Sequence, residues 1–358
     1  MASIPRLEIN DFLPRFQLLN QHGRVSDLFR HALGKPILLA VLRGTPGPAE
    51  SELLRGFAAE AERLAPLAHL MMISDRPAAE TAQLAADFGF DFPVMSDEAG
   101  QMTALLPQDA LPPPVALCFL LTDANRRVLE ILPSAGGVEV LASLAAKLTA
   151  AAAGPAEIVR PLAPVLYLPR VLDPAQCRSL IELYHSGGNT PTGIKRSTDE
   201  QLGGFQNKDV KIRRDHVITD PARARALGDI VGKRVVPEIF KAFSFRVKYV
   251  KEFKIGRYGA DDKGFFRPHR DNYGERGGRR FAMSLNLNSE DYEGGNLTFP
   301  EYGPALYRPG SGDAVVFSCY LVHEALPVTR GARYVLLTFF YGEEGEGDGG
   351  QGGPPPQT

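Results

Sequence analysis

The stretch RPGSGDAVVFSCYLVHEALPVTRGARYVLLTFF, residues 308–340, decides the fold of the C-terminal half of the chain. It contains the apolar run AVVFSCYLVH and, after glycine and proline residues, most of a second run, RYVLLTFFY. Runs of this composition between turn residues are typical of β-strands. Similar runs lie upstream, in the segments FRVKYVKEFKIGRYG (245–259), RRFAMSLNLN (279–288) and GNLTFP (295–300). Short strands in this succession predict a β-sandwich or a β-barrel.

Two polar residues mark the ends of these apolar runs. His323 ends the first run, and Arg333 opens the second. Side chains alternate along a strand, so Arg333 shares a face with Val335, Leu337 and Phe339. A buried unpaired charge is expensive, and a bound dicarboxylate would give this arginine a bidentate partner. A structural salt bridge or water at the strand mouth would also satisfy Arg333, and His323 could be an ordinary half-buried histidine.

A second histidine stands two places before an acidic residue, in His269–Arg270–Asp271. On a strand, the first and third of these side chains would point to the same face. Together with His323 they would form a set of two histidines and one carboxylate that leaves coordination positions open. That arrangement is diagnostic of non-haem iron(II) oxygenases. The alternative interpretation is a surface histidine near a solvated aspartate.

Residues 161–343 resemble the prolyl-4-hydroxylase-like branch of the 2-oxoglutarate/Fe(II)-dependent dioxygenases. The resemblance rests on residues 308–340 and 279–288 and on three further segments, RYGADDKGFFRPHRDN (257–272), EGGNLTFPEYG (293–303) and APVLYLPRVLDPAQCRSLIELY (163–184). It implies a double-stranded β-helix (jelly-roll) domain with flanking helices. One of these helices is also predicted locally, with Asp173 as N-cap, Pro174 in the first turn and Gly187 at the end.

The resemblance also implies roles for individual residues. It implies that three residues bind Fe(II): His269, Asp271 and His323. Arg333 would bind the distal carboxylate of 2-oxoglutarate, and Tyr258 matches a family tyrosine that lines the cosubstrate pocket. Asn286 lies where relatives often have a tyrosine that touches 2-oxoglutarate, and an amide could donate a similar hydrogen bond. Ascorbate is expected as a reductant, beside the substrates 2-oxoglutarate and O2.

The expected activity is hydroxylation of an unactivated C–H bond, coupled to decarboxylation of 2-oxoglutarate to succinate and CO2. The resemblance favours a prolyl-hydroxylase-like reaction on a small-molecule or peptidyl substrate, with a free or peptidyl amino acid as target. The alternative is a non-catalytic jelly-roll/thioredoxin-like scaffold for binding or sensing. A third hypothesis, a thiol peroxidase fused to an inert partner, depends on the N-terminal half.

Residues 1–150 have the pattern of an α/β domain. The apolar runs KPILLAVLRG (35–44) and AHLMMIS (68–74) predict buried strands, and the segment between them has helical periodicity. The segment VALCFLLTDANRRVLEIL (115–132) predicts two more strands around a polar turn. Strands that alternate with helices, with one late hairpin, predict a thioredoxin-like arrangement.

The opening of this half, residues 5–135, resembles the peroxiredoxins. That family places a reactive cysteine at a helix start, three residues after a threonine, but here Thr45 is followed at that distance by Pro48. A thiolate at a helix N-terminus is the chemistry of that fold, so this domain is predicted to be redox-inactive. Cys118 lies inside an apolar run and is expected to be an inert core thiol, with Cys177 and Cys319 as packing residues.

Composition sets the remaining expectations. The predicted boundaries are 1–150, a linker at 151–160, the oxygenase domain at 161–343 and a disordered, glycine-rich tail at 344–358. A net charge of -2 gives no reason to expect nucleic acid. No apolar run reaches the ~20 residues that span a bilayer, and three scattered cysteines are typical of a reducing compartment. We expect a cytoplasmic protein without a membrane partner. One candidate role of the N-terminal domain is to form a homodimer.

Overall fold

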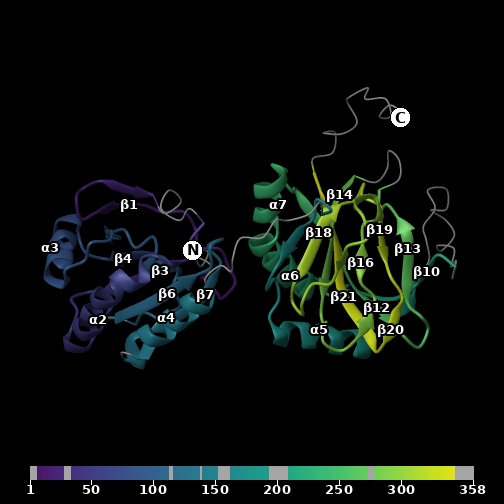
Figure 1. The fold of residues 1–358 in the computed structure, drawn as a ribbon, viewed down its shortest axis with the longest axis horizontal. Coiled ribbons are helices and arrows are strands. Elements are labelled where there is room, and N and C mark those ends of the chain that lie inside the picture. The colour runs from purple at the N-terminus through teal and green to yellow at the C-terminus, as the bar shows by residue number, and fades with distance from the viewer. Residues whose placement is uncertain are drawn as a thin grey trace, which may run out of the picture. The chain divides into compact units, whose positions relative to one another are not determined.

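The computed structural model describes residues 6–27, 34–112, 116–137, 139–151, 162–192, 209–272 and 278–342. The chain divides into two compact units, Met1–Ala156 and Glu157–Thr358 (Figure 1). The predicted linker, apart from its first residue, and the predicted tail lie outside the described residues.

The N-terminal unit is built on one mixed seven-stranded sheet with the strand order β2-β1-β5-β4-β3-β6-β7. The strands β3, β4 and β5 are parallel neighbours, whereas β6 and β7 are antiparallel. The strands are β1 (Gln17–Asn20), β2 (Val25–Asp27), β3 (Ile37–Arg43), β4 (His69–Ser74), β5 (Val94–Ser96), β6 (Ala116–Thr122) and β7 (Val128–Pro133). The helices are α2 (Pro48–Leu64), α3 (Ala78–Phe88) and α4 (Glu139–Ala151), with short 3-10 turns η1 (Thr103–Leu105) and η2 (Ser134–Gly136).

Both faces of this sheet are covered, which explains the unbroken apolar runs of its central strands. Alternate residues of β3 point to opposite sides. Leu38 belongs to a core formed with α2, α3 and α4, in which Phe57 packs against three other phenylalanine rings. Leu39 belongs to a second core, which residues 7–18 and the segment around Met102 cover. The predicted mixed α/β organisation of this half is confirmed.

The N-terminal unit has no thiol at the helix start. Pro48 is the first residue of α2, and Cys118 lies on β6 with no exposure to solvent. Burial raises the pKa of the Cys118 thiol to about 12. Cys177 and Cys319, in the other unit, are also buried and unpaired. The prediction that all three are packing residues is confirmed.

The C-terminal unit contains two main sheets in which every described strand pairing is antiparallel. The larger has the order β8-β18-β14-β21-β12-β11-β9 and the smaller β10-β13-β19-β16-β17, with a separate pair β15-β20. Its strands are β8 (Leu166–Leu168), β9 (Thr190–Pro191), β10 (Lys211–Ile212), β11 (Arg214–Val217), β12 (Tyr249–Gly259), β13 (Phe265–His269), β14 (Arg279–Asn286), β15 (Glu293–Gly294), β16 (Leu297–Thr298), β17 (Leu306–Tyr307), β18 (Ala314–Ser318), β19 (His323–Ala325), β20 (Val328–Arg330) and β21 (Ala332–Tyr341).

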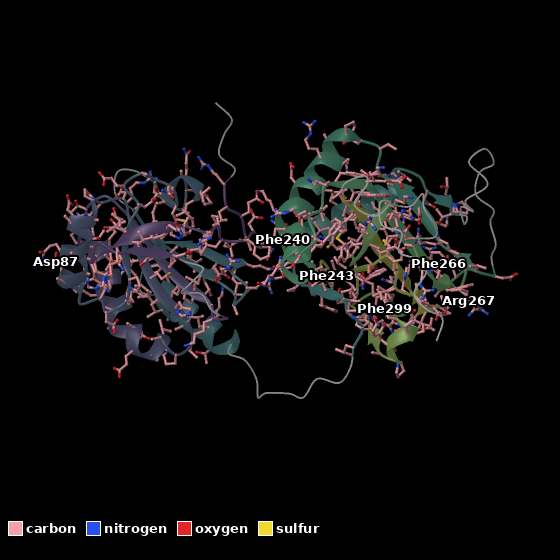
Figure 2. All side chains as sticks on the ribbon, turned by 90° about the horizontal axis from the view of Figure 1, so that it is seen from above. Asp87, Phe240, Phe243, Phe266, Arg267 and Phe299 are labelled. Atoms are coloured by element: carbon pink, nitrogen blue, oxygen red, sulfur yellow. The ribbon has the colours of Figure 1, made fainter. Side chains whose placement is uncertain are left out.

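Three helices cover the outer face of the larger sheet (Figure 1). They are α5 (Pro174–Ser186), α6 (Pro221–Arg234) and α7 (Val236–Phe243), and a 3-10 turn η3 (Pro300–Tyr302) lies between β16 and β17. The start of α5 is the predicted one, because the Asp173 side chain accepts a hydrogen bond from the Gln176 amide in a capping box. Phe243 of α7, labelled in Figure 2, stacks on Phe281 of β14 with ring centroids 4.9 Å apart.

The inner faces of the two sheets enclose a second apolar core. Phe299, also labelled in Figure 2, packs edge-on against Tyr307 and Phe317. Leu297 of the smaller sheet and Val335 of the larger belong to the same cluster. The larger sheet is therefore covered on both faces, and the smaller sheet faces it across this core.

The apolar composition of segment 312–328 predicts a single strand, but the structure contains two. The segment forms β18 in the larger sheet and β19 in the smaller sheet. Between them the chain turns, and the Leu321 amide donates to the Ser318 carbonyl at 3.0 Å. The apolar run is continuous because both strands and the turn line the inner core. His323 therefore opens a strand of the smaller sheet and does not end a strand of the larger one.

No helix among the described residues is both long and apolar enough to cross a membrane.

Gly331 forms the turn into β21, the strand that carries Arg333. Its φ is +70°, and a Cβ atom there would overlap the carbonyl oxygen of Asp291. We expect Gly331→Ala to lower the free energy of unfolding by about 2 kcal/mol or more, because an L residue meets both backbone strain and a clash. Gly228, inside α6, has ordinary φ and open space around it. Gly228→Ala is the matched control and should stabilise by about 0.5–1 kcal/mol. Thermal unfolding of both variants checks this, and equal midpoints would contradict it.

Candidate metal centre and its cavity

The two predicted histidines are direct cross-strand partners. His269 is the last residue of β13, His323 is the first of β19, and the two are paired in the smaller sheet. Their ring centroids are 4.2 Å apart. Asp271 is not on the strand, in contrast to the alternation argument. It lies in a bend after β13, where its amide donates to the Cys319 carbonyl at 3.1 Å. This backbone contact, and not strand periodicity, brings the carboxylate to the histidines.

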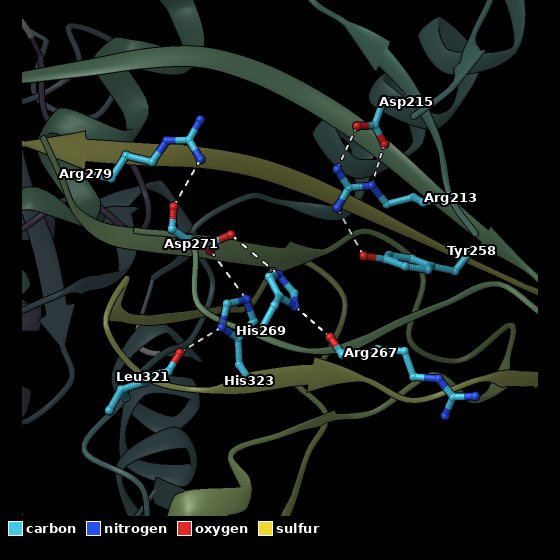
Figure 3. Close-up of polar contacts among 9 residues, drawn as sticks. All are labelled: Arg213, Asp215, Tyr258, Arg267, His269, Asp271, Arg279, Leu321 and His323. Atoms are coloured by element: carbon cyan, nitrogen blue, oxygen red, sulfur yellow. Dashed lines mark hydrogen bonds and ion pairs between the residues drawn. The ribbon is translucent and has the colours of Figure 1, made fainter. Parts of the chain in front are cut away.

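The three side chains converge on one point (Figure 3). Asp271 Oδ1 is 3.6 Å from His269 Nε2, and Oδ2 is 3.4 Å from His323 Nε2. One ligand atom from each residue lies within 4.8 Å of the others, a spacing that one metal ion can bridge. The structure therefore brings His269, Asp271 and His323 together.

Hydrogen bonds fix which nitrogen of each imidazole faces the centre. His269 Nδ1 is 2.8 Å from the Arg267 carbonyl, and His323 Nδ1 is 3.1 Å from the Leu321 carbonyl (Figure 3). A carbonyl oxygen only accepts, so each Nδ1 carries the proton. In a neutral ring Nε2 then keeps its lone pair, which is the form that binds a metal.

The protonation states also fit a divalent cation. Burial lowers the pKa of His323 to about 4, so its ring is neutral near pH 7. Burial opposes ionisation of Asp271, but its basic neighbours His269, His323 and Arg279 outweigh it and lower the pKa of Asp271 to about 2, so the carboxyl group is ionised near pH 7. The Asp271 carboxylate and the neutral His323 imidazole are therefore ready as ligands without prior loss of a proton. This donor set fits iron(II).

The cluster opens into a cavity of about 820 Å³. That volume lies within the range of small-molecule sites. The apolar part of its wall comes from both sheets: Phe266, Leu297, Phe317, Ala325, Leu337 and Phe339. Tyr258 and Arg333 line the same cavity as the three ligands, but Asn286 does not.

Arg333 is the buried cation of this cavity, with 1% of its surface exposed. Its partners are neutral. Nε and Nη2 donate to Asn286 Oδ1 at 3.1 Å, Nη2 also donates to Ser284 Oγ at 3.1 Å, and Nη1 donates to the Gly295 carbonyl at 2.8 Å. No carboxylate in the described part of the chain forms an ion pair with it. A buried guanidinium held in place without a counter-charge fits a dicarboxylate ligand.

Asn286 lies behind Arg333 and does not face the cavity. It has no exposure to solvent. Its amide nitrogen lies 2.8 Å from Tyr292 Oη and 2.9 Å from both Ser289 Oγ and the Pro309 carbonyl, while its oxygen accepts from Arg333. Asn286 therefore does not lie where it could contact 2-oxoglutarate directly, in contrast to the expectation from the resemblance. The amide positions the arginine, because these neighbours use its whole hydrogen-bonding capacity.

Tyr258 is paired directly with Arg333 in the register of β12 and β21. Its ring centroid is 5.7 Å from the guanidinium carbon. Its hydroxyl accepts a hydrogen bond of 3.1 Å from Arg213, which is also bound bidentately to Asp215 at 2.6 and 2.7 Å (Figure 3). The structure places Tyr258 in the predicted cavity and adds a fixed Arg213–Asp215 pair beside it.

Sequence reasoning did not identify several charged cavity residues, among them Lys211, Arg213, Asp215 and Arg279. The first three lie on or beside β10 and β11, which are two and four residues long. Strands this short have no readable alternation. The available signal was the charged pattern KIRRD at 211–215, which is also typical of a solvated surface.

The family comparison matches residues 253–341 to the 2OG-Fe(II) oxygenase superfamily. This range contains His269, Asp271, His323 and Arg333. Among curated proteins, the chain is similar to the multifunctional procollagen lysine hydroxylase and glycosyltransferase LH3 of Rattus norvegicus, with 29% identity over 188 residues. It is also 26% identical over 188 residues to procollagen-lysine,2-oxoglutarate 5-dioxygenase 1 of Mus musculus.

Both alignments cover 51% of this chain but only 24% and 25% of the relatives. The chain thus spans about a quarter of the length of the curated relatives it matches. Among solved structures, a Pseudomonas putida prolyl-4-hydroxylase is 20% identical and covers 51% of this chain and 94% of its own, with a TM-score of 0.40. Peroxidoxin BcpB from Mycobacterium tuberculosis is 24% identical and covers 40% and 98%, with a TM-score of 0.36.

The superfamily match and the ligand geometry concern the same unit of the chain. The matched range begins inside β12 and ends with β21, so it includes both histidine strands and the arginine strand. Residues 253–341 of the C-terminal unit thus match the 2OG-Fe(II) oxygenase superfamily, whose members use Fe(II), 2-oxoglutarate and O2, and the prediction from the motifs is confirmed at the level of this superfamily.

Proposed function

We propose that this protein is an Fe(II)- and 2-oxoglutarate-dependent dioxygenase that hydroxylates an unactivated C–H bond of an amino-acid-like substrate, free or within a peptide. The reaction would be coupled to decarboxylation of 2-oxoglutarate to succinate and CO2. One observation carries this proposal. Three side chains of metal-ligand type converge in one cavity with Arg333, a buried cation that pairs with no acidic residue among those that the structure describes.

Each residue then has a defined task. When bound, iron(II) supplies the oxygen chemistry that no protein side chain provides. His269, Asp271 and His323 hold it through one atom each and leave positions for small ligands. Arg333 binds the distal carboxylate of 2-oxoglutarate and so fixes the orientation of the keto acid. The Tyr258 ring closes the cavity wall beside that arginine.

The apolar wall completes the site. Side chains of Leu297, Phe317, Ala325 and Leu337 line the cavity from the two facing sheets. Water is poorly held between such groups, which strengthens the charged contacts and protects a reactive centre from side reactions.

The choice of an amino-acid substrate rests on two resemblances. The motifs resemble the prolyl-4-hydroxylase-like branch, and the names of two curated relatives refer to lysine hydroxylation of procollagen. Both reactions place a hydroxyl group on an unactivated carbon of an amino-acid side chain. Ascorbate as reductant, a cytoplasmic location and a homodimer through the N-terminal domain stay predictions.

The two folds belong to the same proposal. Two facing antiparallel sheets, with the two histidine ligands on the smaller sheet and Asp271 just after β13, support a double-stranded β-helix in the C-terminal unit. A central β3-β4 parallel pair with β6 and β7 antiparallel beside it supports a thioredoxin-like domain in the N-terminal unit. Because Pro48 stands at the start of α2, that domain would have no thiol redox activity.

The test is succinate formation from 2-oxoglutarate under air by the full chain, before and after iron removal with a chelator. We expect succinate only when iron(II) is present, with recovery on its return. Amino acids and peptides can then be screened for stimulation. Iron binding without succinate would indicate an enzyme that requires its own substrate. No iron binding and no succinate would favour the scaffold hypothesis.

A second prediction concerns the missing counter-charge of Arg333. Asn286→Asp should raise the Kd of 2-oxoglutarate about tenfold or more, because a carboxylate at this position would neutralise the arginine and compete with the cosubstrate. Asn288→Asp is the matched control, since Asn288 is buried near the end of the same strand and bonds Ala332 and Tyr334, not Arg333. Calorimetric titration measures both. Equal affinities would show that the charge of Arg333 does not decide cosubstrate binding.

A further inference from the structure

The cavity wall is strongly basic. Its lining contains six basic residues, Lys211, Arg213, Lys254, Arg270, Arg279 and Arg333, against three acidic residues, Asp215, Glu252 and Asp271. An excess of one sign in a cavity raises the local concentration of ligands of the opposite sign. The excess of positive charge therefore favours anionic ligands in this cavity.

Ion pairs account for half of the basic residues. Arg213 pairs with Asp215 at 2.6 Å, Lys254 with Glu252 at 2.6 Å, and Arg270 with Glu301 at 2.5 Å. Lys211, Arg279 and Arg333 form no ion pair with any carboxylate among the residues that the structure describes. These three are the charges that a ligand can neutralise.

The proposed cosubstrates account for only one of them. Iron(II), doubly charged 2-oxoglutarate, Asp271 and Arg333 together carry no net charge. Among the residues that the structure describes, the two basic side chains of Lys211 and Arg279 are then still without a counter-charge in the loaded site. A desolvated charge without a partner is unfavourable. With both cosubstrates bound, the cavity would therefore still favour the binding of a further anion.

Lys211 lines the same cavity as the iron ligands, and the Phe266 ring connects it to one of them. Its ammonium nitrogen is 4.8 Å from the centroid of the Phe266 ring, and this ring stacks on His269 at 3.4 Å. Burial, with Arg213 and Lys254 nearby, lowers the pKa of Lys211 to about 7 in spite of Asp215 and Asp271. The ammonium group thus lies in an environment with too little negative charge, and a bound anion would relieve this.

Arg279 lies near Asp271 from another direction (Figure 3). It opens β14 of the larger sheet, whereas Lys211 comes from β10 of the smaller sheet. Its guanidinium carbon is 4.0 Å from the centroid of the Phe339 ring, and Nη1 donates to the Asp271 carbonyl at 3.4 Å. One weak hydrogen bond leaves most of its donors for a ligand in the cavity.

We propose that the substrate carries a free carboxylate, which Lys211 and Arg279 bind beside the iron ligands. This inference rests on the proposed function and narrows its substrate class. A lysyl side chain inside an uncharged peptide would add a further positive charge to the cavity and is disfavoured. The carboxylate has two sources, the α-carboxylate of a free amino acid or an acidic group of a peptide.

The test uses the full chain loaded with iron(II) and 2-oxoglutarate under nitrogen, so that binding is measured without turnover. Calorimetry compares the twenty free amino acids with their N-acetyl derivatives, which keep the α-carboxylate, and with their N-acetyl methylamides, which mask it. Binding of free or N-acetyl compounds but not of methylamides would indicate the α-carboxylate. Binding of only the aspartate and glutamate methylamides would indicate a side-chain carboxylate, as in a peptide. Either result supports the proposal.

Two variants test whether Lys211 and Arg279 bind the carboxylate. Lys211→Met and Arg279→Met should each weaken the best carboxylate compound about tenfold or more, the usual size of a charge-assisted hydrogen bond. Lys241→Met and Arg330→Met are controls at exposed positions paired with Glu238 and Glu293, and should bind as wild type does. Without ligand, Lys211→Met should leave the unfolding temperature unchanged or raised, because it removes an unpaired charge. A large loss of stability would indicate a structural lysine and overturn the assignment.

Several results would overturn the proposal. These are equal binding of masked and unmasked compounds, unchanged affinity in both cavity variants, or no binding by any carboxylate compound. A separate titration of iron(II) and 2-oxoglutarate into the wild-type chain comes first. If these bind and the carboxylates do not, only this inference fails. If iron(II) or 2-oxoglutarate does not bind, the proposed function fails and the inference fails with it.

Discussion

Asp271→Ala should remove both iron(II) binding and succinate formation. Asp271 supplies the one anionic ligand of the cluster, and its two oxygens lie 3.4 and 3.6 Å from the two histidine nitrogens. Loss of an outer partner of a metal ligand costs roughly 10- to 100-fold in affinity, so loss of the ligand itself should exceed this. The measurements are equilibrium dialysis against iron(II) and succinate formation under air.

Asp261→Ala is the matched control for this prediction. Asp261 belongs to the same unit, but its side chain is 67% exposed and pairs with Arg257 at 2.9 Å. Such surface pairs are worth about 0–1 kcal/mol, so this variant should bind iron and form succinate as wild type does. Iron affinity of Asp271→Ala within a few-fold of wild type would show that the cluster is not the metal centre.

Elements with strong local signals follow from the sequence. The helix α5 begins and ends where Asp173, Pro174 and Gly187 predict, because the cap satisfies backbone groups whatever the surroundings. Strands such as β3 and β6 are predicted because a sheet covered on both faces needs unbroken apolar runs. In these cases the physical cause is local, so one segment contains enough information.

Short strands do not follow from the sequence in this way. The strands β1, β2, β5, β9, β10 and β11 have two to four residues each. At this length neighbouring strands, and not periodicity, decide whether the segment pairs. The break between β18 and β19 cannot be predicted from the sequence either, because both strands and the turn that joins them have the same apolar composition.

The candidate site divides in the same manner. Iron chemistry restricts its ligands to a few residue types, so His269, Asp271 and His323 can be proposed from their spacing and from a family resemblance. Charges such as Lys211 and Arg279 have no such signal, because lysine and arginine are most often solvated. Only the fold shows that these two come from different sheets to one cavity. Asn286 lies on the predicted strand but behind Arg333, a position that the sequence does not reveal because its contacts depend on residues up to 47 positions away.

Arg333→Leu should produce the largest loss of cosubstrate affinity. Truncation of one partner of a buried charge pair costs about 2–5 kcal/mol, which corresponds to a Kd for 2-oxoglutarate raised roughly thirtyfold or more. Arg333→Lys keeps the charge but not the planar pair of donors, so its affinity should be intermediate. Iron(II) binding should persist in both variants, because no iron ligand contacts this side chain directly.

The readout for this prediction is the rise in unfolding temperature on addition of 2-oxoglutarate, since a ligand that binds only the folded state stabilises it in proportion to the logarithm of its concentration over Kd. Wild type should show a clear rise, and Arg333→Leu little or none. Arg330→Leu is the matched control, because Arg330 lies three residues earlier, is 64% exposed and pairs with Glu293. If Arg333→Leu were stabilised as much as wild type, another cation of the cavity would have to anchor the cosubstrate. The charge balance would then assign Lys211 or Arg279 to 2-oxoglutarate, and only the other of these two would be left, together with Arg333, for the substrate carboxylate.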